Sequence, residues 1–182
     1  MLCDTRWVHR HLFSQLITQG AALDYAGHYR GEALSCLRTY NVQVGRMKGT
    51  PADQVCHSME RLGRLIRKYV GELDASFQRQ PGIARGDRLV AVTRVAAWMF
   101  ATFLKVHPYA NGNGHIGRIM LAALMHRYGF PLRSFPIEPG PKEDAYYEAL
   151  IAYQNRPCDP GPLERYLLRH FALPPSTGPA PP

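Results

Sequence analysis

Cysteine is scarce in this chain, since its 182 residues include four and none of them forms a Cys-x-x-Cys pair. Widely separated cysteines fit the reduced thiols of a cytoplasmic protein better than a disulfide framework or a zinc site. We therefore expect free thiols at Cys3, Cys36, Cys56 and Cys158.

Long hydrophobic runs are also missing. No apolar stretch approaches the length of a membrane span, and the first residues include acidic Asp4 and no signal-peptide core. These absences predict a soluble, cytoplasmic protein with no membrane partner, and they leave open export by a route that needs no cleaved signal.

Acidic residues are few, 14 against 22 lysines and arginines, so the net charge is +8. Such a charge attracts phosphates, which makes nucleic acid one candidate partner. One expected helix surface is basic, with Arg61, Arg64, Arg67 and Lys68. Aromatic residues are not interleaved with it as in a single-strand groove, so we expect a solvated face and no nucleic-acid function. The basic field would also attract ATP or an acidic protein.

The chain is rich in hydrophobic periodicity. With 46% hydrophobic residues it can bury a sizeable core. We expect one domain at 1–173 and a disordered, proline-rich tail at 174–182. The spacing of apolar residues predicts a mainly α fold, with a loop at 81–87 and helices at 8–18, 21–37, 88–106, 142–154 and 161–171.

A further helix has a clear N-terminal signal. Thr50 offers an N-cap, Pro51 suits the first helical position, and Asp53 places a negative charge in the first turn. The apolar stripe that follows consists of Val55, Met59, Leu62, Ile66 and Tyr69.

The helix at 88–106 ends beside the most informative segment. Its apolar stripe comprises Leu89, Val92, Ala96, Met99, Phe100 and Phe103. Pro108 disfavours helical dihedrals at His107, so the helix should stop there. The imidazole is then left at a helix end, where a substrate could reach it.

A glycine-rich loop follows, and the helical period resumes at Ile116 and ends at 129–131. Asn113 or Gly114 stands where an N-cap would fall, and Gly112 and Gly114 let a ligand approach the backbone. Amides at a helix N-terminus favour anions. His115 and Arg118 share one face, and Arg118 can hold a phosphate by two parallel hydrogen bonds. A base, an anion cradle and a cation predict a phosphate site.

Each of these features has a structural alternative. The glycine-rich loop could be a plain turn, and His107 could cap a helix C-terminus with a positive imidazole. His115 could be structural, and the valines Val42 and Val44 could form an ordinary edge strand. A zinc site at His107 and His115 would lack a third ligand of suitable spacing.

The segment 107–118 resembles the Fic/Doc family motif, His-x-Phe-x-Asp/Glu-Gly-Asn-Gly-Arg-x-x-Arg. It reads His107-Pro108-Tyr109-Ala110-Asn111-Gly112-Asn113-Gly114-His115-Ile116-Gly117-Arg118. The resemblance implies transfer of AMP from ATP to a Ser, Thr or Tyr hydroxyl of a target protein. It makes His107 the base, Gly112 to Gly114 the anion hole for the transferred phosphoryl group, and Arg118 the residue that holds the outer phosphates. Tyr109 would pack beneath the loop.

The sequence departs from the motif at two positions. Asn111 replaces the carboxylate that binds magnesium in the family, and its neutral amide should hold Mg²⁺ less well. His115 replaces the first arginine, so the phosphate clamp should be weaker or pH-dependent. Two alternatives therefore stay open: the pocket uses another donor, or the chain is a catalytically silent binding or regulatory protein.

The resemblance covers roughly 29–168. Residues 37–45, preceded by Tyr29-Arg30, are similar to the segment that enters the family's β-hairpin flap, and 45–49 would be its turn. Val42, Gln43 and Val44 would bind a target segment by main-chain hydrogen bonds. The tyrosines of the helix at 142–154 are similar to those that help to enclose the nucleotide in the family: Tyr146, Tyr147 and Tyr153.

Many members of the family are inhibited by a helix with the pattern Ser/Thr-x-x-x-Glu-Gly/Asn. Glu138 alone has a serine or threonine four residues earlier, Ser134, but Pro139 follows it. We therefore recognise no built-in inhibitor, and regulation in the family manner would need a separate chain, as a toxin has its antitoxin.

Overall fold

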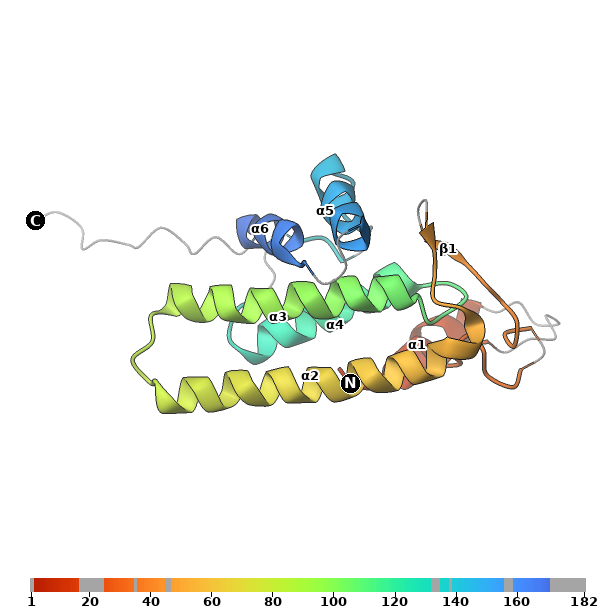
Figure 1. Ribbon diagram of the computed structural model, residues 1–182, viewed down its shortest axis with the longest axis horizontal. Coiled ribbons are helices and arrows are strands. Elements are labelled where there is room, and N and C mark those ends of the chain that lie inside the picture. Colours follow the sequence, from red (N-terminus) through yellow and green to blue (C-terminus); the bar gives the residue numbers. More distant parts are fainter. Residues whose placement is uncertain are drawn as a thin grey trace, which may run out of the picture.

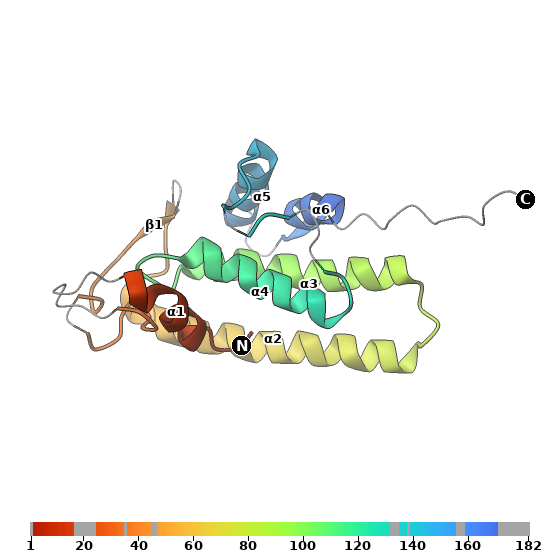
Figure 2. The same ribbon diagram turned by 180° about the vertical axis from the view of Figure 1, so that it is seen from behind.

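Helix α3 (Arg85–Val106) is the central element of the fold. All six residues of its expected apolar stripe are buried: Leu89, Val92, Ala96, Met99, Phe100 and Phe103. Helices α2 (Ala52–Arg79) and α4 (Asn113–Arg127) run antiparallel to α3, and α5 (Asp144–Asn155) and α6 (Gly161–His170) pack on its other side (Figures 1 and 2). The mainly α fold expected from the sequence is confirmed.

The structure is a computed structural model that describes residues 2–16, 25–34, 36–44, 47–131, 135–137, 139–155 and 159–170. The expected tail at 174–182 therefore lies outside the described residues, as do Cys158, Ser134 and Glu138. Cys3, Cys36 and Cys56 are free thiols, as expected.

The sequence-based expectation about membrane spans overlooked α3. Within the described ranges it is the one helix long and apolar enough to cross a membrane, but 61% of its most apolar window is buried in the bundle. A helix surrounded by other helices must be apolar on most of its surface, so its composition is that of a core helix.

Two small elements lie at the end of the bundle where α3 ends. Helix α1 (Arg6–Phe13), continued by a 3₁₀ turn η1 (Ser14–Leu16), packs there near the start of α2 (Figure 2). The expected hairpin consists of β1 (Gln43–Val44) and β2 (Met47–Lys48), which pair antiparallel and stand beside the same end (Figure 1). The turn expected at 45–49 was too long, since β2 occupies two of its residues.

The expected helix at 21–37 is wrong for the residues described within it, which form turns and bends. Gly27 and Gly31 have φ angles of +80° and +85°, outside the helical region. A β-carbon on Gly31 would lie 1.8 Å from the Ala52 carbonyl oxygen. Close packing of this segment against the start of α2 therefore overrides its apolar periodicity.

Some helix ends lie a few residues from the positions expected from the sequence. The N-cap of α2 is Pro51 and not Thr50, and the Asn41 side chain caps it from outside by accepting the Ala52 N–H at 2.9 Å. Helix α3 begins at Arg85, inside the loop expected at 81–87. At α2, a neighbouring segment thus supplies the cap that Thr50 was expected to provide.

Candidate active site

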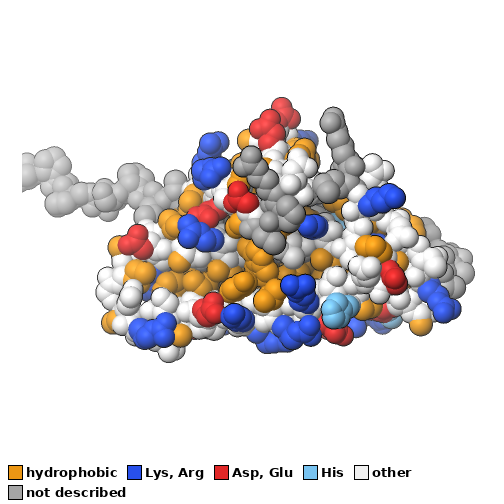
Figure 3. All heavy atoms as spheres, in the orientation of Figure 1, with side chains coloured by type: hydrophobic (Ala, Val, Ile, Leu, Met, Phe, Trp, Pro, Cys, Tyr) orange, Lys and Arg blue, Asp and Glu red, His pale blue; other side chains and the backbone are white. Residues whose placement is uncertain are grey.

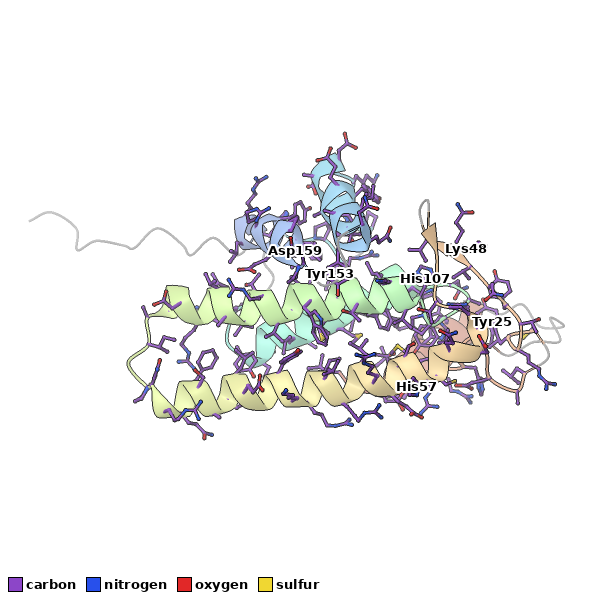
Figure 4. The ribbon with its side chains drawn as sticks, in the orientation of Figure 1. Tyr25, Lys48, His57, His107, Tyr153 and Asp159 are labelled. Atoms are coloured by element: carbon purple, nitrogen blue, oxygen red, sulfur yellow. The ribbon has the colours of Figure 1, made fainter. Side chains whose placement is uncertain are left out.

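His107 follows the last residue of α3, where the sequence placed the helix end. Its φ and ψ are 53° and 60°, a left-handed conformation that is uncommon for a residue with a side chain. The Nδ1 atom lies 3.2 Å from the Leu104 carbonyl oxygen. A carbonyl only accepts, so Nδ1 carries the hydrogen and Nε2 keeps its lone pair. Figure 4 shows His107 at the end of α3, near the hairpin that carries Lys48.

The surroundings of His107 keep it neutral. Burial holds the pKa of the His107 imidazole below its usual value near 6.5, and the positive charge of Arg30 lowers it further, against the hydrogen bond to Leu104. At neutral pH the ring is therefore a proton acceptor, as a general base must be.

Tyr109 anchors the loop from beneath, as expected. Its side chain is fully buried, its hydroxyl lies 2.6 Å from the Thr5 hydroxyl, and its ring stacks on His9 with centroids 3.8 Å apart. The Asn113 side chain accepts the Tyr109 N–H at 2.9 Å and donates to the Tyr109 carbonyl at 2.8 Å. Asn113 thus holds the loop together, and its side chain is turned inward.

We expect Tyr109→Phe to lower the free energy of unfolding by about 1–2 kcal/mol, because it leaves the buried Thr5 hydroxyl without this partner. Urea unfolding of Tyr109→Phe, Thr5→Val and the double variant measures the coupling. If Thr5→Val lowers the free energy of unfolding as much in Tyr109→Phe as in the native protein, the contact between the two hydroxyls does not contribute to stability.

His9 is a site residue that sequence reasoning missed. It is fully buried in α1, and its ring stacks on Phe13 as well as on Tyr109. The Gly27 N–H donates to its Nδ1 at 2.9 Å, so Nε2 carries the hydrogen and faces the Asn111 carbonyl at 3.3 Å. His9 and Phe13 are four residues apart on one helix face, a pairing that could have indicated their common role.

The buried His9 should make stability depend on pH. Burial lowers the pKa of His9 from 6.5 to about 4, so the unfolded chain binds a proton that the folded protein rejects. The contribution of neutral His9 to the free energy of unfolding is fully present above pH 6.5. It falls by at most about 3 kcal/mol as the pH drops to 4. Urea unfolding at pH 7 and 4.5 checks this, and His9→Gln should show a smaller difference between the two pH values. An equal difference in both proteins would contradict it.

Gly112, and not Asn113 or Gly114, is the N-cap of α4, with φ at +70°. A β-carbon there would lie 2.4 Å from Cζ of Phe13, so α1 supports the loop directly. The first amides of α4 have no carbonyl partner within the helix. Gly117 brings α4 close to α3, since a β-carbon there would lie 2.8 Å from the Phe100 ring. Together these contacts set the N-terminus of α4 beside the end of α3.

Asn111 is exposed, and its side-chain nitrogen donates to the Tyr25 hydroxyl at 2.8 Å. This contact leaves Oδ1 as a single neutral ligand for a metal. Among the described residues no three acidic, histidine or cysteine side chains gather. The residues therefore fit a magnesium ion only if ATP phosphates and water supply most of its ligands, as is usual for this ion.

Arg118 lies over the first turn of α4. Its Nε donates to the Ile137 carbonyl at 2.7 Å, and a β-carbon on Gly114 would lie 2.9 Å from its Nη1. The segment before α5 therefore orients the guanidinium across the N-terminus of the helix. The ring of His115 meets Phe13 edge-on, with centroids 6.2 Å apart.

Comparison with known proteins agrees with this geometry. A profile of the Fic/DOC family matches residues 3–125, which is more than half of the chain. The chain belongs to the Fic/DOC family. The match to the Fic family covers α1, the hairpin, α2 and α3, and it ends within α4.

Two further similarities support the assignment. A Fido domain-containing protein of Dictyostelium discoideum is 39% identical over 56 residues, which are 31% of this chain and 37% of that protein. The N-terminal FIC domain of Bep8, a VirB-translocated effector of Bartonella sp. 1-1C, superimposes with a TM-score of 0.62. That match has 16% identity and covers 94% of this chain and 74% of the other, so it shows the fold.

Other residues of this Fic domain have mainly structural surroundings. Tyr146 is buried beside Arg118, whereas Tyr147 is 52% exposed. The Tyr153 hydroxyl lies 2.7 Å from the Thr102 hydroxyl. Four basic side chains of α2 are exposed: Arg61, Arg64, Arg67 and Lys68. Lysine and arginine side chains are frequent along the lower edge of the face shown in Figure 3.

Proposed function

We propose that this Fic domain transfers AMP from ATP to a hydroxyl side chain of a target protein. The observation that carries the proposal is the contact of His107 Nδ1 with the Leu104 carbonyl oxygen at 3.2 Å, which assigns the ring hydrogen to Nδ1 and makes Nε2 the basic nitrogen. A base of this kind near the N-terminus of α4, whose amides attract anions, suits phosphoryl chemistry.

In this reaction Nε2 of His107 takes the proton of the target hydroxyl as its oxygen attacks the α-phosphorus of ATP. The new O–P bond forms while the bond to the bridging oxygen of pyrophosphate breaks. The amides of residues 112–114, which open α4, donate to the α-phosphate oxygens. Arg118 orients the pyrophosphate, and His115 contributes a second contact when it is protonated.

Asn111 Oδ1 would hold magnesium together with the phosphates, and the ion would neutralise part of their charge. Val42, Gln43 and Val44 of the hairpin would pair with the target segment. We place the reaction in the cytoplasm, with a separate inhibitory chain as the regulator, as in a toxin–antitoxin pair.

The test uses ATP labelled at the α- or the γ-phosphate, with magnesium and a cell lysate. Transfer of the α label to protein, but not the γ label, is the expected result. Transfer of γ label alone would replace the proposal by a kinase activity. Label from neither position would refute AMP transfer.

A second candidate is a Fic domain that uses another donor or none. The hydrogen bond from Asn111 to Tyr25 favours this candidate, because it engages the amide that stands where the family motif has a carboxylate. If the domain uses another donor, one compound in a panel of nucleotides and phospho-metabolites should raise the melting temperature of the protein more than ATP does.

We expect Asn111→Asp combined with His115→Arg to lower the magnesium concentration needed for half-maximal α-label transfer. The aspartate adds a negative charge that binds the ion, and the arginine adds a positive charge that binds the phosphates. A native protein that already transfers AMP should be improved. Activity that arises only in the double variant would identify the native chain as silent.

A further inference from the structure

Arg30 is a fully buried arginine whose hydrogen-bond acceptors are all main-chain carbonyl oxygens. Its guanidinium donates at 2.8–3.0 Å to the carbonyls of Tyr40, Thr50, Val106 and His107. Its own N–H donates to the Pro108 carbonyl at 2.8 Å. One residue thereby contacts the end of α3 and both ends of the hairpin segment.

This arrangement is more than a helix cap. Carbonyls at a helix C-terminus attract a cation, and Val106 and His107 alone would satisfy that need. Burial lowers the pKa of Arg30, which shows that the environment opposes its charge. A charge kept in such a place needs several good partners. The additional bonds to Tyr40 and Thr50 supply them, and these two residues flank β1 and β2.

A second contact joins the hairpin base to the bundle, since the Asn41 side chain accepts the Ala52 N–H of α2 at 2.9 Å. Within the hairpin, the Gly49 N–H donates to the Val42 carbonyl at 3.0 Å and closes its base. The planar guanidinium of Arg30 bonds both to this base, at Tyr40 and Thr50, and to the His107 carbonyl. Its fork of donors is rigid, so it specifies the distance and the angle between them.

We infer that Arg30 is a positioning residue that sets the register between the hairpin, which would hold the target segment, and the imidazole of His107, which would take the proton. The inference rests on the proposed function and deepens it. Group transfer requires the target oxygen near its reacting partners at a defined angle, and a displacement of about 1 Å can cost about a hundredfold in rate. Arg30 also bonds the carbonyl of His107, whose left-handed backbone needs support from its surroundings.

The first test compares native protein with Arg30→Lys, which keeps the positive charge and loses the fork. With the protein most strongly labelled in the lysate as substrate, we expect kcat for α-label transfer to fall about a hundredfold, with the dissociation constant for ATP within about twofold of native. Arg38→Lys, at an exposed arginine of the same segment, is the matched control and should retain native kcat. Native kcat in Arg30→Lys would overturn the inference.

The second test needs no substrate. In Arg30→Lys, hydrogen exchange should accelerate together in 41–50 and 107–113, while α5 and α6 exchange as in the native protein. Acceleration in only one of the two segments would overturn the inference. A native protein that transfers no label, with both segments loosened in Arg30→Lys, would refute the proposed function and leave the coupling by Arg30 supported.

If Arg30→Lys does not fold, the native protein provides the measurement. The Arg30 Nε–H should then exchange as slowly as the amides of the hairpin, because it is buried against the His107 carbonyl. Rapid exchange of that proton would contradict a fixed bridge.

Discussion

Replacing His107 by alanine is expected to lower the rate of α-label transfer by about 10² to 10⁴, the usual contribution of a general base. The reason is the loss of Nε2, the basic nitrogen that the Leu104 hydrogen bond specifies. Initial rates of protein labelling at saturating ATP measure the effect, and binding of ATP should change little because the imidazole acts on the target hydroxyl.

Two further variants separate chemistry from structure. His107→Asn removes the base but keeps a residue that tolerates the left-handed backbone, so its rate should fall as in the alanine variant while its stability stays closer to native. His57→Ala, on the exposed side of α2, should keep the native rate (Figure 4). A His107→Asn protein that transfers label at the native rate would exclude His107 as the base.

Gly112→Ala should lower the free energy of unfolding by about 2–5 kcal/mol. Alanine at a φ of +70° costs about 1–2 kcal/mol. Its β-carbon would also overlap the Phe13 ring, which adds about 1–3 kcal/mol of overpacking. Because Phe13 stacks on His9, the displacement should spread to the support of the loop, so transfer activity should be lost as well. Urea unfolding measures the first effect.

Gly129→Ala is the matched control, since Gly129 has a similar φ of +78° and a β-carbon there would have no neighbour within 4 Å. Its cost should be the backbone part alone, about 1–2 kcal/mol. In addition, Phe13→Ala should make Gly112→Ala less costly by removing the overlapping ring. Equal costs for the two glycines would mean that the Phe13 contact is unimportant.

The parts of the fold that local physics controls were predictable. The stripe of α3 was read correctly because a helix surrounded by others must place apolar residues at nearly every inward position. The stop at His107 followed from Pro108, whose ring acts on its immediate neighbour. Resemblance of a short motif then led to the family, because the motif lies within twelve consecutive residues.

The errors arose where a distant segment overrides a local signal. The apolar spacing at 21–37 predicted a helix, yet close packing of Gly31 on Ala52 requires a turn. Thr50 had the residue type of an N-cap, but its carbonyl is bound by Arg30 and the cap comes from Asn41. These contacts join residues 11 to 21 positions apart, beyond the reach of a helical period.

The amino-acid order thus established the helical class, the end of α3 and the residues of the motif, since each depends on neighbours within one or two turns. The support of the loop by His9, Phe13 and Arg30 came only from packing in three dimensions. The local sequence offers little beyond the four-residue spacing of His9 and Phe13 to indicate this role, because the partners of these residues lie as far as 102 positions away. Burial and hydrogen bonding to those partners make a buried histidine and a buried arginine part of the site.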